Sequence, residues 1–199
     1  MSNFFQQLKA LQPWQQTAFA AAMAERMLPN YALFCQVVDD REAQPLKNAL
    51  MLVWEFLSSK DSKINFEVQL EKVAEQIPDA ASYPMYGVYP AIDAAMAVHT
   101  TMELAMGTQA EEVTRISRLM RQTIIRFVEA TEDLPEDEAL RRKALNDHEL
   151  MQFDHVFQDE VLVQLQDMKA YDKNGLKALR LMAQNDGVSC LGLSAEEVD

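Results

Sequence analysis

The stretch "PAIDAAMAVHTTMELAMG", residues 90–107, decides the fold that we predict for this chain. Proline is tolerated in the first turn of a helix and glycine often follows the last turn, so Pro90 and Gly107 predict a helix over about 90–106. Alanine, methionine and other apolar residues cover most of its circumference, which is typical of a helix surrounded by other helices. We therefore expect an Ala/Met-rich central helix within a bundle.

Asp93 is the unusual residue of this helix, because it places a carboxylate inside an apolar run. If Pro90 is the first helical residue, Asp93 is the fourth, and the helix dipole stabilises its charge by only about 0.3–1 kcal/mol. Desolvation of a buried carboxylate costs more than this. We expect Asp93 to have hydrogen-bond donors, to be protonated, or to face a water-filled pocket. Tyr86, Tyr89 and Arg26 are donors that could reach it.

The composition indicates one all-helical domain. The chain has 199 residues, of which 49% are hydrophobic and 25% charged, as in ordinary globular proteins. Only five residues are glycine and twelve are methionine, and no alternating run of strand length stands out. We predict an all-α, single-domain bundle of about seven to nine helices over residues 1–199, with an irregular C-terminal tail from about 187.

Prolines and capping residues divide the chain into helices. Pro13 begins a helix predicted to reach about Leu28, Pro29 ends it, and Asn30 caps a short helix to about Val38. Further helices are predicted at about 45–58, 65–77, 108–130, 136–144, 146–170 and 176–184. The expected N-caps of three of these are Asn65, Thr108 and Asn146.

The net charge of −13 limits the partners that we expect. Residues 132–172 hold twelve acids and four bases, a local charge of 4 − 12 = −8. Such a field repels nucleic acid and anionic lipid, whereas a basic protein partner or a merely solvated face stays possible. No run approaches the length of a membrane helix, and the N-terminal residues MSNFFQQLKAL lack the basic and continuous apolar regions of a signal peptide. Cys35 and Cys190 suggest buried reduced thiols. We expect a cytoplasmic protein that does not bind membranes.

Catalytic and cofactor motifs are missing from the sequence. It contains no Gly-rich phosphate loop, no Gly-x-Ser-x-Gly and no His-Glu-x-x-His, and we predict no cofactor and no catalytic residue. His155 and Asp159 lie four residues apart and could hold a transition metal, but solvated surface side chains are the preferred interpretation.

Three blocks of the sequence resemble a known family. They are "WQQTAFAAAMAERMLPNYALF" (14–34), "VWEFLSSKDSKINFEVQLEKVAEQIPDA" (53–80) and "YGVYPAIDA" (86–94). In this order they are similar to the hallmarks of the YjaG-like family, small bacterial proteins of unknown function, and the likeness is looser after about residue 132. The resemblance implies an all-helical cytoplasmic protein, and it implies no established activity or catalytic residue.

The helix ends near "ERMLPNY" and "YGVYPAIDA" combine aromatic and charged side chains, the types that carry binding energy at interfaces. We predict a polar cluster or pocket formed by Glu25, Arg26, Asn30, Tyr31, Tyr86, Tyr89 and Asp93. Between these two, a buried cluster that only fixes helix junctions is the preferred interpretation. Two functions stay open. The preferred one is a non-enzymatic helical protein that binds a protein partner or forms a homo-oligomer, and the other is an enzyme or small-molecule binder with a pocket near Tyr86, Tyr89 and Asp93.

Overall fold

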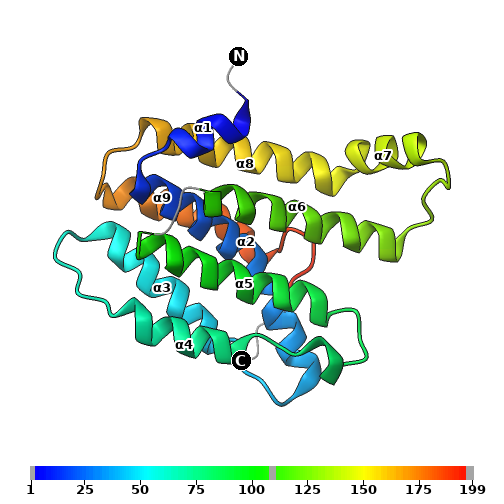
Figure 1. Ribbon diagram of the computed structural model, residues 1–199, viewed down its shortest axis with the longest axis horizontal. Helices are drawn as coiled ribbons and strands as arrows, with labels where there is room; N and C mark the ends of the chain where they lie inside the picture. The colour runs from blue at the N-terminus through cyan, green and yellow to red at the C-terminus, as the bar shows by residue number, and fades with distance from the viewer. Residues whose placement is uncertain (1–2, 108–110, 196–199) are drawn as a thin grey trace.

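The computed structural model describes residues 3–107 and 111–195, which form nine α-helices and two short 3₁₀ helices (Figure 1). The α-helices are α1 Phe4–Ala10, α2 Pro13–Val38, α3 Gln44–Ser58, α4 Phe66–Gln76, α5 Val88–Ala105, α6 Glu111–Thr131, α7 Glu138–Asp147, α8 Glu149–Asp167 and α9 Lys173–Gln184. The 3₁₀ helices are η1 Ala80–Ser82 and η2 Asn185–Gly187. Extended pairing in this part of the chain is limited to one bridge between Val188 and Ser194. The all-α prediction is confirmed.

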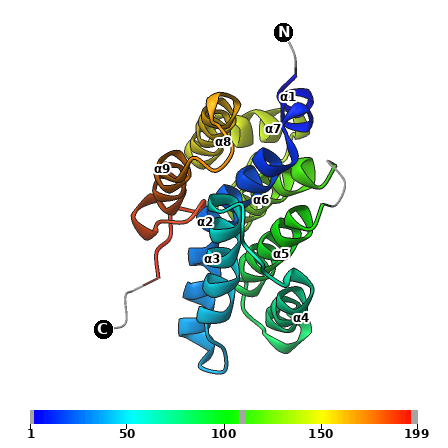
Figure 2. The same cartoon turned by 90° about the vertical axis from the view of Figure 1, so that its left-hand side faces the viewer.

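Two helices share the centre of the bundle. The predicted central helix, α5, contacts α2, α3, α4 and α6, while α2 contacts α3, α5, α6, α8 and α9. Figure 2 shows α8 and α9 on one side of α2, with α5 and α4 on the other. The two central helices bury small side chains completely, namely Ala18, Ala20, Ala21, Ala22 and Ala24 of α2 and Ala91, Ala94, Ala95 and Ala97 of α5. Small side chains let helix backbones approach closely, which is why this pair forms the middle of the fold.

Helix α2 continues through Pro29, so the prediction of a helix end at Leu28 and a new cap at Asn30 is wrong. A proline inside a helix costs about 3 kcal/mol, but the residues around it, including Leu28 and Tyr31, are buried. Packing of both halves against the core therefore outweighs the cost. The C-terminal segment meets α2 at this point, where the Cys190 amide donates to the carbonyl oxygen of Arg26 at 3.1 Å.

Helix α5 begins at Val88, two residues before the predicted start at Pro90. Asp93 is consequently the sixth helical residue and lies beyond the first turn, where the helix dipole acts. Gly107 follows the helix with a φ of 91°, a left-handed conformation suited to glycine, as predicted for a helix end. Thr108, the predicted cap of the next helix, lies outside the described residues.

The start of α8 differs from the prediction. Asn146 lies inside α7, and the N-cap of α8 is His148, whose Nδ1 accepts a hydrogen bond from the Leu150 amide at 3.2 Å. Phe153 of α8 is 59% exposed, whereas the polar Gln158 is buried. The side of α8 that faces the bundle is therefore partly polar.

The remaining features follow the predictions more closely. Cys35 and Cys190 are both free and buried. Residues 188–195 contain no helix, yet Cys190 and Leu191 of this segment are buried in the same core as α1 to α9. Among the helices of the described chain, none has the length and apolar character needed to cross a membrane.

Candidate functional site

The seven residues predicted to form one cluster lie at three separate places, so that prediction needs correction. Residues of α2 project at steps of about 100° around the helix, and neighbours in sequence therefore face different elements. Glu25, Arg26 and Asn30 meet α9 and the C-terminal segment, while the Tyr31 hydroxyl donates to the carbonyl oxygen of Gln76 at 3.0 Å. The others, Tyr86, Tyr89 and Asp93, belong to the segment that leads into α5 and to its first turns.

Asp93 is held by α6. Its Oδ2 accepts hydrogen bonds from Thr123 Oγ1 at 2.7 Å and from Arg126 Nη1 at 3.4 Å, and its side chain is 10% exposed. Burial raises the pKa of Asp93, and the Thr123 hydrogen bond and the Arg126 charge act in the opposite direction. The rings of Tyr86 and Tyr89 lie 6.0 Å apart beside this site, and the Tyr89 side chain is about half exposed. The sequence missed the two partners because they lie thirty or more residues away on another helix.

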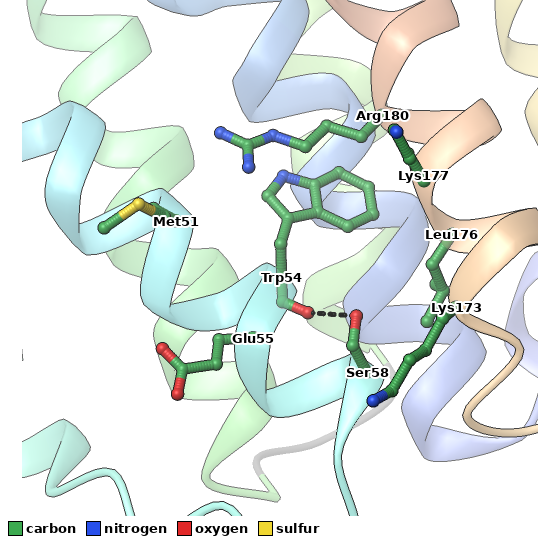
Figure 3. Close-up of a pocket in the computed structure, with 8 residues that line it drawn as sticks. All are labelled: Met51, Trp54, Glu55, Ser58, Lys173, Leu176, Lys177 and Arg180. Atoms are coloured by element: carbon green, nitrogen blue, oxygen red, sulfur yellow. Dashed lines mark hydrogen bonds between the residues drawn. The ribbon is translucent and has the colours of Figure 1, made fainter.

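Glu25 joins three helices beneath the protein surface. Its Oε2 accepts from Trp54 Nε1 at 2.9 Å, and its Oε1 accepts from Gln184 Nε2 at 2.9 Å and from Arg180 Nε at 3.3 Å. The Glu25 side chain is 6% exposed, so this carboxylate is a buried charge with a cationic partner. Trp54 and Arg180 also line a surface cavity of about 260 Å³ between α3 and α9 (Figure 3).

Arg26 closes the end of α9 from the side of α2. Its Nε and Nη2 donate to the carbonyl oxygens of Ala183 and Met182, both at 2.9 Å, and its guanidinium carbon lies 3.9 Å from the centre of the Phe157 ring. Cations near the last carbonyl groups of a helix are favourable, and stacking on an aromatic face adds to this. Burial lowers the pKa of Arg26, an effect that the negative charges of Glu160 and Asp154 oppose.

A larger cavity of about 410 Å³ lies between α8, the end of α9 and the C-terminal segment, and we call it the α8–α9 groove. Arg26 and Phe157 form part of its lining, together with Met120 of α6. Two lining residues of α8 remain largely in solvent, since Phe153 is 59% and Val156 is 53% exposed. The groove therefore combines a buried interior with accessible apolar side chains.

A buried polar network fixes α8 in the orientation that exposes these two residues. The Asp154 side chain is 0% exposed and accepts from Gln158 Nε2 at 2.7 Å and from Arg121 Nε at 3.2 Å. Gln158 also accepts from the Ser117 hydroxyl, so the network ties α8 to α6. Burial raises the pKa of Asp154, and its hydrogen bond from Gln158 opposes the shift. Because Asp154 and Gln158 point inward, Phe153 and Val156 point outward.

The metal candidates form an ordinary surface pair. His155 Nε2 and Asp159 Oδ2 are 3.4 Å apart, and their side chains are 64% and 48% exposed. Within residues 3–107 and 111–195, no group of three or more His, Cys, Asp or Glu side chains is placed to hold a metal ion.

Comparisons with known proteins agree with this fold over nearly the whole chain. A family described as "Protein of unknown function (DUF416)" matches residues 3–194. The uncharacterized protein YjaG of Salmonella typhimurium is 33% identical over 193 residues, which cover 96% of this chain and 95% of that protein. An uncharacterized protein of Haemophilus influenzae is 35% identical over 188 residues, or 94% of each chain.

A solved structure shows the same architecture. The crystal structure of a DUF416 family protein from Shewanella baltica matches with a TM-score of 0.90 and 34% identity, covering 98% of this chain and 100% of that one. The resemblance to YjaG-like proteins seen in the three sequence blocks is thereby confirmed. The chain belongs to the DUF416 family, a family of proteins of unknown function.

Proposed function

We propose that this protein is a non-enzymatic cytoplasmic interaction protein, and that its α8–α9 groove binds a basic, amphipathic segment of a protein partner. The observation that carries the proposal is the exposure of Phe153 and Val156 at a cavity whose interior is already formed. Val163, 57% exposed, continues the same stripe two turns along α8. Apolar side chains grouped at the edge of a cavity are typical of a surface that another molecule covers.

The charge of α8 supports a basic partner. This helix carries five acids and no lysine or arginine, the acids being Glu149, Asp154, Asp159, Glu160 and Asp167. Asp154 is occupied by Arg121, but Glu160 lines the groove and is exposed to solvent. Opposite charges at the rim of an interface speed association and select partners. A second copy of this chain would instead bring another net charge of −13 to the same surface.

The rigid interior of the groove also favours binding. Arg26, held by two carbonyl groups of α9, and the network around Asp154 fix its walls before any partner arrives. A preformed site loses less conformational entropy on binding than a flexible one. An amphipathic helix laid along a groove between two helices is a common mode of peptide recognition. The two buried free cysteines support a reducing compartment such as the cytoplasm.

The alternative function near Tyr86, Tyr89 and Asp93 has less support. The Asp93 carboxylate is engaged by Thr123 and Arg126, and none of those three residues lines the α8–α9 groove or the cavity of Figure 3. We therefore place the proposed binding site on α8 and α9.

A peptide titration tests the proposal. The probe is a fluorescent Lys/Leu peptide designed as an amphipathic helix, compared with a Glu/Leu counterpart and with a scrambled Lys/Leu peptide of the same composition. We expect the amphipathic basic peptide to bind most tightly, and the double substitution Phe153→Ser and Val156→Ser to weaken it by at least about tenfold. The matched control makes the same change to serine at Val37 of α2 and Val68 of α4, which are 58% and 44% exposed.

Three results would contradict the proposal. The first is equal binding of the scrambled peptide, which would mean that charge alone attracts it. The second is equal loss in the control variant. The third is a dimer in light scattering that the substitutions at Phe153 and Val156 dissociate, because the groove would then be the contact between two copies.

A further inference from the structure

His148 joins two helices at the edge of the bundle. It follows the last residue of α7 and precedes the first residue of α8, and Figure 1 shows α7 beyond the start of α8, at the edge of the molecule. The structure describes every residue of α7, and none of them is buried. The His148 amide donates to the carbonyl oxygen of Leu145 at 3.2 Å, so its backbone ends α7, while its side chain caps α8. The connection between the two helices therefore depends on one residue.

Two contacts define one protonation state of the His148 ring. Its Nδ1 accepts a hydrogen bond from the Leu150 amide at 3.2 Å, so this nitrogen carries a lone pair. Its Nε2 lies 2.9 Å from Oε1 of Glu132, and an ionised carboxylate only accepts, so Nε2 carries the proton. Both contacts are satisfied by the neutral ring. Histidine is the side chain that changes charge between about pH 5 and 8, and the charged ring has a proton on both nitrogens.

Protonation of the ring sets these two contacts against each other. The contact with Glu132 becomes an ion pair, but the new proton on Nδ1 faces the Leu150 N–H, and two donors form no hydrogen bond. A positive charge at the start of a helix is also unfavourable because of the helix dipole. The charged ring therefore keeps Glu132 and loses its contact with the first turn of α8.

The charges around His148 leave Glu132 as its one ionic partner. Among the described residues, Glu132, at the end of α6, is the one whose charged group lies within 4.0 Å of the ring nitrogens. Arg141 of α7 is bound to Glu129 of α6 at 2.9 Å. The other charged side chains of α7 and of the first turn of α8 are exposed, namely Glu138, Arg142, Lys143, Asp147 and Glu149.

We propose that His148 is a pH-sensitive cap of α8, and that protonation of its ring releases the first turn of this helix. Leu150, in that turn, lines the α8–α9 groove beside Gly192 of the C-terminal segment. Asp154 is held by Gln158 and by α6, so the release is confined to the start of the helix. Mild acid therefore lowers the affinity of the groove for its partner, a consequence that rests on the proposed function.

NMR of the wild-type protein tests the cap. The ring nitrogen shifts should show a neutral His148 ring with its proton on Nε2 at about pH 8. From about pH 8 to about pH 5.5, the protection of the Leu150 amide from hydrogen exchange should fall by about five- to tenfold, the loss expected for a removed helix cap. Val161, further along the same helix and fully buried, is the reference amide and should keep its protection.

Two variants assign the effect to His148. The change His148→Asn supplies a cap that does not titrate, so its Leu150 amide should keep the same protection at both pH values. The matched control is His155→Asn on the same helix, at a side chain 64% exposed, which should behave as the wild type. A neutral ring with its proton on Nδ1, constant protection of Leu150 in the wild type, or the same loss in His148→Asn would overturn the proposal.

The basic amphipathic peptide reports on the groove. Its affinity should fall by at least about threefold over the same pH range in the wild type and in His155→Asn, and stay constant in His148→Asn. Constant affinity in the wild type, while Leu150 loses its protection, would overturn the link between the cap and the groove. Failure of the peptide to bind at the higher pH would refute the proposed function alone, because the ring nitrogens and the Leu150 amide decide the cap without it.

Discussion

We expect the replacement of Glu25 by alanine to destabilise the junction of α2, α3 and α9 more than the replacement of an exposed glutamate does. The carboxylate accepts three hydrogen bonds, two at 2.9 Å from Trp54 and Gln184 and one at 3.3 Å from Arg180. Alanine offers no acceptor. The Trp54 N–H, which belongs to a side chain only 4% exposed, then lies in the core without its partner.

The magnitude follows from these contacts. An unsatisfied buried donor costs about 1–3 kcal/mol, and loss of one member of a buried ion pair costs about 3–5 kcal/mol. The second cost is reduced here because the Arg180 side chain is 31% exposed and can turn towards water. We expect a loss of about 3 kcal/mol in the free energy of unfolding, which for a chain of this size lowers Tm by about 6–12 °C.

Thermal and urea unfolding followed by circular dichroism measures this change. Glu25→Gln keeps an acceptor for Trp54 and should cost about 1 kcal/mol, and Glu71→Ala on the exposed side of α4 serves as the control. Trp54→Phe should cost less in the Glu25→Ala background than in the wild type, with a coupling energy of about 1 kcal/mol. A Glu25→Ala protein within about 0.5 kcal/mol of the wild type, or strictly additive effects, would refute the assigned network.

Three further predictions test other parts of the structure. The pKa of Asp93 is raised in the folded state, so the protonated carboxyl favours folding. As the pH rises from the ordinary carboxyl pKa through the raised pKa, the stability of the wild type should therefore fall relative to that of Asp93→Asn. Parallel curves of Tm against pH for the two proteins would contradict this. Phe153→Ala should change stability by no more than about 0.5 kcal/mol, whereas Phe157→Ala, at a side chain 4% exposed, should cost about 3–5 kcal/mol in urea unfolding. Pro29→Ala should raise Tm, because alanine restores a backbone N–H donor inside α2 and removes the cost of about 3 kcal/mol that proline has inside a helix. A lower Tm would contradict this and show that the bundle requires the proline.

Helix ends that depend on one turn of chain were predicted well. Asn65 caps α4 by accepting from the Val68 amide at 3.3 Å, Pro13 begins α2, and Gly107 follows α5 in a left-handed conformation. In each case the residue acts through its own backbone geometry or through a partner within one turn. Such signals can therefore be recognised from a few neighbouring residues of the sequence.

Helix ends that depend on packing were not predicted. The local sequence predicts a helix end at Pro29, but the core contacts of residues on both sides keep α2 continuous. Asn146 reads as a cap, but α7 extends past it and His148 caps α8 instead. The orientation of α8 also depends on packing. Its polar residues Asp154 and Gln158 occupy the inward face because Arg121 and Ser117 of α6 form hydrogen bonds with them, and the apolar Phe153 is left exposed.

The sequence by itself determined the all-helical class, the buried character of the 90–106 segment and the excess of negative charge, because these depend on composition and on periodicity within single helices. Only the tertiary structure decided which side chains share a site. Glu25 meets Trp54 and Arg180 across 29 and 155 residues of chain, and the two cavities lie between helices whose order in space no local pattern encodes. Contacts of this kind form when helices pack, and the packing depends on the shape and polarity of several helix faces at once.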